Sequence, residues 1–327
     1  MAQQLSVNQA AAKLVERLCN KADKYGVFVN ETKSGTTIID AGIKARGGFL
    51  AGELVTEICL GGYGETRISN AQVGDLVFPS ILVHTDNPAI ATLGSQFAGW
   101  QIKVGDYNAI GSGPARALAL KPRKIYDSIE YKDDADVAVI VLETSKEPPE
   151  SVIAYISEQS KVTPDNLSII LVPTMSLAGA IQVSGRIVET GVHKLMKLGL
   201  DPKAIMYALG YAPITSLHPK FAQAMGRTND AILYAGTTYY VVRYEDDERL
   251  NEIVEKAPSL ASKSYGKPFY EIFKKADYDF YKIDPNLFAP AVVVVNNAET
   301  GRTFKAGQIN VEVFKQSTGL SNLSTDH

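Results

Sequence analysis

Four polar side chains at helical spacing are the best candidates for chemistry in this chain. Gln182, Arg186, Glu189 and His193 lie four, three and four residues apart, so they share one face of a helix predicted over residues 175–198. On that face Arg186 can pair with Glu189, whose carboxylate could act as a general base. The commoner interpretation of this spacing is a solvent-exposed ion pair worth only about 0.2–0.5 kcal/mol. Two features favour a site: neighbouring charges are sparse, and Gly185 weakens the helix but permits close approach of a ligand.

A glycine-rich segment is the second candidate. Gly111, Ser112, Gly113 and Arg116 belong to the sequence GSGPAR, which opens an Ala/Leu-rich stretch expected to be helical. Glycines expose backbone N–H groups and a helix N-terminus attracts negative charge, so this loop could bind a phosphate or carboxylate. It is not a Walker A loop, because no Gly-Lys-Ser/Thr follows. A tight turn followed by a solvated basic face explains the same residues. The basic residues that follow are Lys121, Arg123 and Lys124.

The remaining composition narrows the classes of function. Cys19 and Cys59 form no CxxC pair, and the four histidines stand in neither an HExxH nor an HxH pattern, so we predict no metal site. The net charge of −3 predicts no general affinity for nucleic acid, and no 18-residue apolar run indicates a membrane span. Two thiols without a disulfide pattern and a polar start, Met1 to Val7, predict a cytoplasmic protein.

The elements that position these residues are typical of a mixed α and β protein, in the range from α/β to α+β. A helix is predicted over 6–25, with Ser6 as its N-cap. Apolar runs at 135–143 and 167–172 flank a helix near 149–160 and predict a β-α-β unit. Strands that are apolar throughout favour a sheet covered on both faces.

The C-terminal third adds another strand and a hairpin. The strand is predicted over 231–243, and the hairpin pairs 291–295 with 303–314. Aromatic side chains between Tyr265 and Phe288 could stack on a flat ligand, but they are expected more often in a core or subunit interface.

The length of 327 residues, with 45% apolar and 21% charged residues, suits about two domains with a substantial core. We predict an N-terminal α/β domain at 1–125 that carries the glycine-rich loops. A second α/β domain is predicted at 126–284 and carries the Arg/Glu helix. A C-terminal hairpin at 285–327 is expected to pack back on the first domain.

Five short motifs stand in an order and spacing that resemble the methenyltetrahydromethanopterin cyclohydrolases over essentially the whole chain. Each motif is weak alone, but five in order are specific. They are Gly52-Glu53-Leu54 with Cys59-Leu60-Gly61-Gly62, Gly94-Ser95-Gln96-Phe97-Ala98-Gly99-Trp100, Gly111-Ser112-Gly113-Pro114-Ala115-Arg116-Ala117, Ser184-Gly185-Arg186-Ile187-Val188-Glu189 and Gly210-Tyr211-Ala212-Pro213.

The resemblance implies reversible hydrolysis of the N5,N10-methenyl cation of tetrahydromethanopterin to the 5-formyl compound, in methanogenic and related one-carbon metabolism. It also implies a homotrimer of two-domain subunits with a large mixed sheet, a pterin in the interdomain cleft, and no metal or redox cofactor. The family's catalytic pair falls on Arg186 and Glu189. Glu189 would deprotonate water, while Arg186 orients the carboxylate and keeps it ionised. The residues expected to contact the pterin or its anionic tail are Ser95, Gln96, Gly111, Ser112, Gly113 and Arg116.

Two other functions fit parts of the sequence. A nucleotide-dependent small-molecule kinase could use the 111–116 loop for phosphate, although no convincing Mg²⁺-binding carboxylate accompanies it. A non-catalytic pterin-binding protein could use the same cleft without the base. ATP-dependent product formation would support the first function, and tight binding without hydrolysis would support the second.

Overall fold

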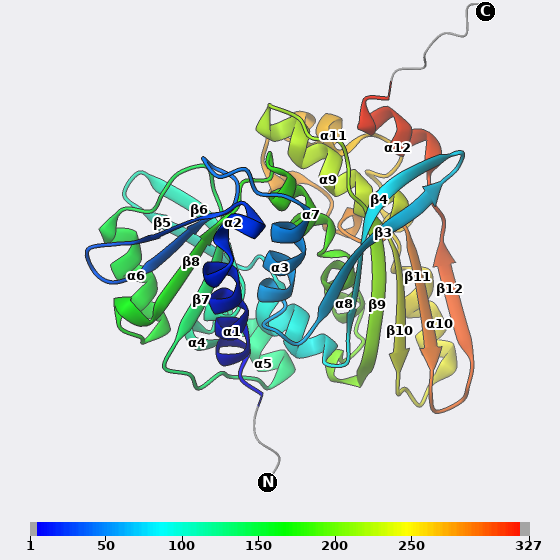
Figure 1. Ribbon diagram of the computed structural model, residues 1–327. Helices are drawn as coiled ribbons and strands as arrows, with labels where there is room; N and C mark the ends of the chain where they lie inside the picture. Colours follow the sequence, from blue (N-terminus) through cyan, green and yellow to red (C-terminus); the bar gives the residue numbers. More distant parts are fainter. Residues whose placement is uncertain (1–4, 321–327) are drawn as a thin grey trace, which may run out of the picture.

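The computed structural model describes residues 5–320, which form two mixed six-stranded β-sheets lying side by side, with helices around and between them (Figure 1). This arrangement confirms the predicted mixed α and β class. Sheet A has the strand order β1-β2-β8-β7-β6-β5, and sheet B has the order β12-β11-β10-β9-β4-β3. The strands of sheet A are β1 (Phe28–Glu31), β2 (Thr37–Asp40), β5 (Trp100–Val104), β6 (Tyr107–Ser112), β7 (Ala138–Glu143) and β8 (Leu167–Leu171). Those of sheet B are β3 (Glu65–Val73), β4 (Leu76–Thr85), β9 (Ile205–Pro213), β10 (Thr237–Val242), β11 (Val292–Asn297) and β12 (Thr303–Gly307).

Sheet A is built around the β-α-β unit predicted from the apolar runs. β7 and β8 are parallel neighbours joined by α6 (Glu150–Ser160), which confirms the prediction. Successive side chains of β7 point to opposite faces of the sheet. Val141 packs in the same core as α1 (Val7–Asn20) and α3 (Phe49–Cys59), whereas Ile140 packs with α6. Both faces are therefore buried, as continuous apolar strands predict.

Sheet B is covered on one face. α8 (Ile187–Lys197) and α10 (Asp247–Glu255) supply buried side chains to the core on that face. On the opposite face the side chains of Tyr207, Leu209 and Tyr239 are 47%, 40% and 40% exposed. Because side chains alternate along β9 and β10, these exposed residues stand together over the middle of the sheet.

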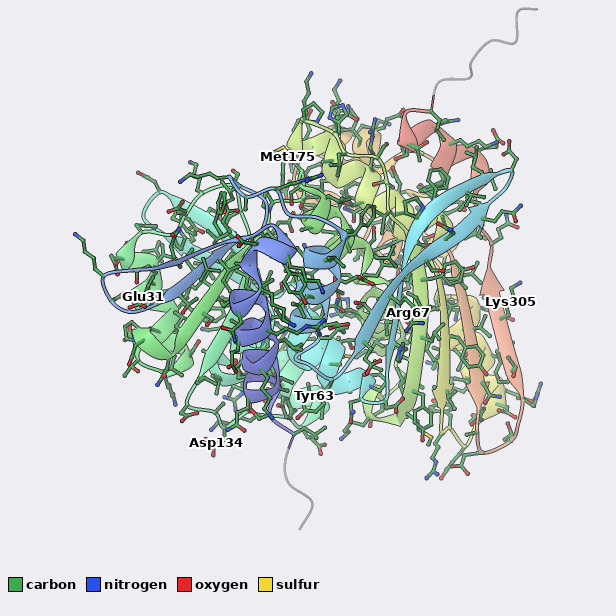
Figure 2. All side chains as sticks on the ribbon, viewed as in Figure 1. Glu31, Tyr63, Arg67, Asp134, Met175 and Lys305 are labelled. Carbon is green, nitrogen blue, oxygen red and sulfur yellow. The ribbon has the colours of Figure 1, made fainter. Side chains whose placement is uncertain are left out.

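The C-terminal hairpin lies at one edge of sheet B. β11 and β12 pair antiparallel, which confirms the predicted hairpin, and β11 runs parallel to β10. The two edge strands carry charged side chains such as Arg67 on β3 and Lys305 on β12 (Figure 2). Charged side chains on an edge strand discourage pairing with a further strand.

Several of the aromatic residues predicted for a core or interface lie in a core, namely Phe269, Phe273, Phe280 and Phe288, whereas the side chain of Tyr278 is 50% exposed. α9 (Phe221–Ala235), α11 (Phe269–Lys275) and α12 (Val311–Thr318) surround a cluster that includes the fully buried Phe269 and Tyr234. The remaining helices are α2 (Ala22–Tyr25), α4 (Ala115–Ala119), α5 (Arg123–Ile129), α7 (Leu177–Ser184) and the π-helix η1 (Ala89–Gln96). Short 3₁₀ segments lie at Pro164–Asn166, Pro202–Ala204, Ser259–Ala261, Phe280–Lys282 and Pro285–Leu287.

Several element boundaries differ from the sequence-based prediction. The helix predicted over 6–25 is two helices, α1 and α2, with Lys21 between them. The helix predicted over 175–198 is two helices, α7 and α8, which meet at Gly185. Residues 231–235 complete α9 and the strand starts only at Thr237, because a short apolar run has no period that separates a buried helix from a strand. The strand predicted to reach residue 314 ends at Gly307, and Asn310 then caps α12 by accepting from the backbone N of Val313.

The two sheets do not divide the chain at one position. Strands from either side of residue 125 share sheet A, while β3 and β4, which precede that residue, belong to sheet B. The division into folding units at residues 125 and 284 stays a prediction.

No helix within residues 5–320 combines the length and apolarity needed to cross a membrane. Over the same residues, no group of three or more His, Cys, Asp or Glu side chains could hold a metal ion.

Candidate functional site

The candidate pair lies where α7 gives way to α8. α7 ends at Ser184, Gly185 is its C-cap, and Arg186 is the N-cap of α8 with φ −79° and ψ 5°. A Cβ on Gly185 would lie 2.5 Å from Cγ2 of Thr56 in α3, so the glycine allows the two helices to approach closely. The close approach expected at Gly185 is therefore made by a neighbouring helix.

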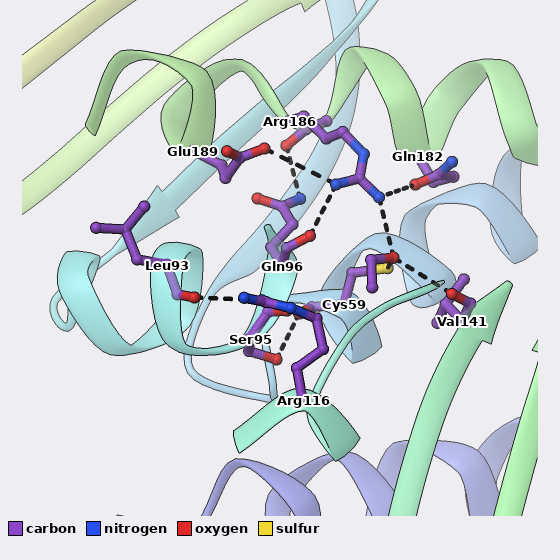
Figure 3. Close-up of polar contacts among 11 residues, drawn as sticks. Cys59, Leu93, Ser95, Gln96, Arg116, Val141, Gln182, Arg186 and Glu189 are labelled. Carbon is purple, nitrogen blue, oxygen red and sulfur yellow. Dashed lines mark hydrogen bonds and ion pairs between the residues drawn. The ribbon is translucent and has the colours of Figure 1, made fainter. Parts of the chain in front are cut away.

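Arg186 is held mainly by uncharged acceptors (Figure 3). Its Nη1 donates to the backbone O of Gln96 at 2.7 Å, and its Nη2 donates to Oγ of Ser112 at 3.0 Å and to Oε1 of Gln182 at 3.2 Å. The carboxylate of Glu189 lies farther away, with Oε2 3.8 Å from Nη1 of Arg186. The shared helix face predicted for Gln182, Arg186 and Glu189 is confirmed by these contacts.

Both members of the pair are buried. The side chains of Arg186 and Glu189 are 11% and 7% exposed, which excludes a solvent-exposed ion pair. α8 packs against sheet B, whereas Ser112 is the last residue of β6 in sheet A. The pair therefore lies at the junction between the two sheets.

Burial dominates the ionisation of Glu189. Loss of solvent raises its pKa from the ordinary 4.5 to about 7, and the positive charges of Arg186 and Arg116 only partly oppose that rise. The prediction that Arg186 favours the ionised form is therefore right in direction, but burial outweighs it. A carboxyl group with a pKa near neutrality can both accept and return a proton at physiological pH.

The π-helix η1 ends at the pair. Its last residue, Gln96, accepts from Arg186 through the backbone O and donates through Nε2 to the backbone O of Gly185 at 3.0 Å. The side-chain Oε1 of Gln96 is buried without a hydrogen-bond partner in the described structure. Gln96 therefore ties η1 to the junction of α7 and α8 and leaves one acceptor unused. π-helical turns often occur at functional sites.

The glycine-rich loop directs its polar groups inward. Ser112 accepts from Arg186 and donates to the backbone O of Val141 at 3.4 Å. Gly113, with φ +94°, donates its N–H to the backbone O of Ser95 at 2.9 Å. The helix that follows, α4, has only five residues. Because these donors bind the protein itself, the loop does not offer the phosphate cradle that a kinase would need.

Five of the six predicted contact residues belong to one connected, buried network around Arg186 and Glu189. Ser95 donates its Oγ to the backbone O of Cys59 at 2.6 Å, and its own backbone O also accepts from Nη1 of Arg116 at 2.9 Å. Arg116 has no exposed surface. The predicted residues in this network are Ser95, Gln96, Ser112, Gly113 and Arg116. Gly111 pairs with Trp100 in sheet A and faces Ile102 and Ile140 instead. Their contact with a substrate stays a prediction.

Two features of the site have no signal in the sequence. Nothing in the residues AIATLGSQ of η1 separates a π-helix from an α-helix. The ring of Phe97 also packs on His193, with centroids 4.8 Å apart, and burial followed by nearby lysines lowers the pKa of His193 to about 4. This histidine is therefore uncharged at neutral pH and extends the same helix face as Glu189.

An open groove of about 420 Å³ also lies between elements packed on the two sheets. Phe49 and Leu177 border it on one side, and Phe78, Ile214 and Leu217 border it on the other. Its lining is mainly apolar and does not include Arg186 or Glu189.

Comparison with known proteins finds a single family along nearly the whole chain. A family model described as "Cyclohydrolase (MCH)" matches residues 6–318. The methenyltetrahydromethanopterin cyclohydrolase of Methanothermobacter marburgensis is 48% identical over 321 residues, which cover 97% of this chain and 100% of the relative. The proteins of the same name from Methanocaldococcus jannaschii and Methanosarcina barkeri are 46% and 41% identical, each over 98% of this chain and 100% of the relative.

Proposed function

The chain belongs to the cyclohydrolase (MCH) family, as its five motifs predicted, and we propose that it is a cytoplasmic enzyme that reversibly hydrolyses N5,N10-methenyltetrahydromethanopterin to the 5-formyl compound. The observation that carries the catalytic assignment is the buried carboxyl of Glu189, with a pKa of about 7, placed 3.8 Å from Arg186. A pKa near the working pH is the property that a general base requires.

Glu189 moves the protons of the reaction. The carbon between N5 and N10 carries part of a positive charge, so water needs only to be positioned and deprotonated as it attacks. Glu189 accepts one proton of that water while the C–O bond forms. The C–N10 bond then breaks, N10 takes the proton from Glu189, and the second proton of the water leaves to solvent as the formyl C=O forms. Cation and water thus give the neutral formyl compound and one proton.

Arg186 and Gln96 position the reacting groups. The guanidinium of Arg186 is fixed by three uncharged acceptors, so it can orient Glu189 without binding both carboxylate oxygens tightly. The unused Oε1 of Gln96 is an acceptor for the attacking water beside that carboxylate. Base catalysis of this kind contributes roughly 10²–10⁴-fold, and positioning adds to it. We propose that no metal or redox cofactor takes part.

An absorbance assay tests this function directly. The near-ultraviolet absorbance of the methenyl cation should disappear on adding enzyme, with a chelator present and without NAD(P) or ATP. Glu189→Gln should abolish turnover with the fold intact, and Glu130→Gln, at an exposed position, should not. Product that forms only with ATP would favour the kinase, and tight binding without turnover by the wild type would favour a pterin-binding protein. Either result contradicts the proposal.

We propose a homotrimer whose contacts involve the uncovered face of sheet B. Tyr239 stands opposite Leu209 in the β9–β10 register, and Tyr207 stands opposite Val241, so the exposed side chains form one largely apolar surface. Surfaces of this kind mark contact sites. Leu209→Glu should reduce the mass measured by analytical ultracentrifugation from three chains to one. A wild type that sediments as a monomer would exclude the trimer.

A further inference from the structure

Arg116 is a fully buried cation that the mechanism above does not use. Its Nε donates to the backbone O of Lys121 at 2.8 Å, and its Nη1 donates to the backbone O of Leu93 at 3.2 Å and of Ser95 at 2.9 Å. Three main-chain carbonyls therefore hold the guanidinium. In this position the guanidinium is not presented at the protein surface.

The carbonyls bound by Arg116 belong to the C-terminal end of η1. The last four carbonyls of a helix have no partner within the helix. Here the carbonyls of residues 93–96 each accept from a side chain. Arg116 donates to the carbonyls of Leu93 and Ser95. The hydroxyl of Tyr126 donates to that of Gly94 at 3.0 Å, and Arg186 donates to that of Gln96. Arg116 and Arg186 thus hold the same helix end, where positive charge is favoured.

The charge of Arg116 acts on Glu189. Among the described residues no carboxylate lies within ion-pair distance of Arg116, and its Nη2 has no hydrogen-bond partner. The rings of Phe97 and Tyr126 flank it, with their centroids 5.3 and 5.6 Å from the guanidinium carbon. Burial raises the pKa of Glu189, and Arg186 and then Arg116 oppose that rise. The electrostatic interaction of a buried charge extends farther than that of an exposed one, because little solvent screens it and no neighbouring carboxylate neutralises it.

We propose that Arg116 is a positioning residue of the cyclohydrolase site: it fixes the end of η1 that holds Gln96 against Arg186, and it supplies a second positive charge to Glu189. Its catalytic consequence rests on the proposed function, while the clamp on η1 rests on geometry alone. This role differs from the sequence-based expectation that Arg116 contacts the substrate tail, and the KM of the variants decides between the two.

Two substitutions separate the two parts of this role. Arg116→Met removes both the clamp and the charge, so kcat should fall by roughly 10- to 100-fold. The acid limb of the pH–kcat profile should also move to higher pH, because one of the charges that favours ionised Glu189 is lost. Arg116→Lys keeps the charge but not the planar fork, so its acid limb should stay near that of the wild type while kcat still falls. Both variants should leave KM little changed.

Amide hydrogen exchange measures the clamp without turnover. Peptides covering residues 89–97 should exchange faster in Arg116→Met than in the wild type, while peptides of α10 should not change. Arg302→Met is the matched control: it removes a guanidinium 5.2 Å from the ring of Phe304, but at a side chain that is 63% exposed on the far edge of sheet B. This control should keep the wild-type kcat, acid limb and exchange in 89–97.

Three results would overturn the role of Arg116. They are an unchanged acid limb in Arg116→Met, unchanged exchange in 89–97, and a raised KM with unchanged kcat, which would indicate a tail ligand. Should Arg116→Met fail to fold, Arg116→Lys gives the same tests of kcat and exchange. If the wild type did not hydrolyse the methenyl compound, the proposed function would be wrong. The exchange experiment would still test whether Arg116 holds the end of η1.

Discussion

Replacing Glu189 by Gln tests whether the base destabilises the fold that contains it. Gln has nearly the shape of the protonated carboxyl, so the two proteins should be almost equally stable where Glu189 is protonated. Burial raises the pKa of Glu189 from 4.5 to about 7 against the effects of Arg186 and Arg116. The folded state therefore binds this proton more tightly than the unfolded chain, and the stability of the wild type falls as pH rises from about 4.5 to about 7. The variant has no such loss.

The size of the effect follows from the gap between the two pKa values. The pKa rises from 4.5 to about 7, and each pKa unit corresponds to about 1.36 kcal/mol. Above neutrality the free energy of unfolding of Glu189→Gln should therefore exceed that of the wild type by about 3 kcal/mol. For 327 residues with an unfolding entropy of roughly 2.1 cal/mol/K per residue, this is about 4 °C in Tm.

Thermal unfolding followed by circular dichroism at pH 4.5 and 8.5 measures this difference. The variant should melt close to the wild type at the lower pH and about 4 °C above it at the higher pH. Glu130→Gln, which removes a carboxylate that is 73% exposed, is the control and should show no gain in Tm over the wild type at the higher pH. A Tm difference between Glu189→Gln and the wild type that is the same at both pH values would refute the reasoning.

Three further predictions concern neighbouring features. Asp230 is fully buried and burial raises its pKa to about 8, so Asp230→Asn should gain stability over the wild type as pH rises through neutrality, which thermal melts at pH 5 and 9 would measure. Gly185→Ala places a methyl group 2.5 Å from Cγ2 of Thr56 and should destabilise the protein by about 1–3 kcal/mol in urea unfolding. Ser112→Ala removes an acceptor of Arg186 and should lower kcat about tenfold with little change in KM, as steady-state kinetics would show.

The parts of the site that the sequence predicts are those set by local spacing. Arg186 and Glu189 share a face because three-residue spacing survives the break between α7 and α8. The unit of β7, α6 and β8 follows in the same way from two apolar runs and the helix between them.

What the sequence does not predict depends on contacts between distant segments. The break at Gly185 arises from Thr56, which is far away in the chain, so periodicity alone extends the helix through it. Arg116 stands in a basic stretch with Arg123 and Lys124, which are exposed, and no local pattern tells which cation turns inward. The pKa of Glu189 is likewise a consequence of burial, which appears only once two sheets enclose α8.

The loose contact within the Arg186–Glu189 pair follows from what the reaction asks of the carboxyl group. Glu189 must take a proton from water and then give it to N10, so neither protonation state can be strongly favoured. A close, two-bonded guanidinium would hold the carboxylate ionised and weaken it as a base, whereas burial without any cation would keep it protonated. At 3.8 Å, with its donors directed mainly to Gln96, Ser112 and Gln182, Arg186 offsets only part of the effect of burial. The resulting pKa of about 7 serves both proton transfers, and the stability lost as pH rises from about 4.5 to about 7 is the consequence of placing it there.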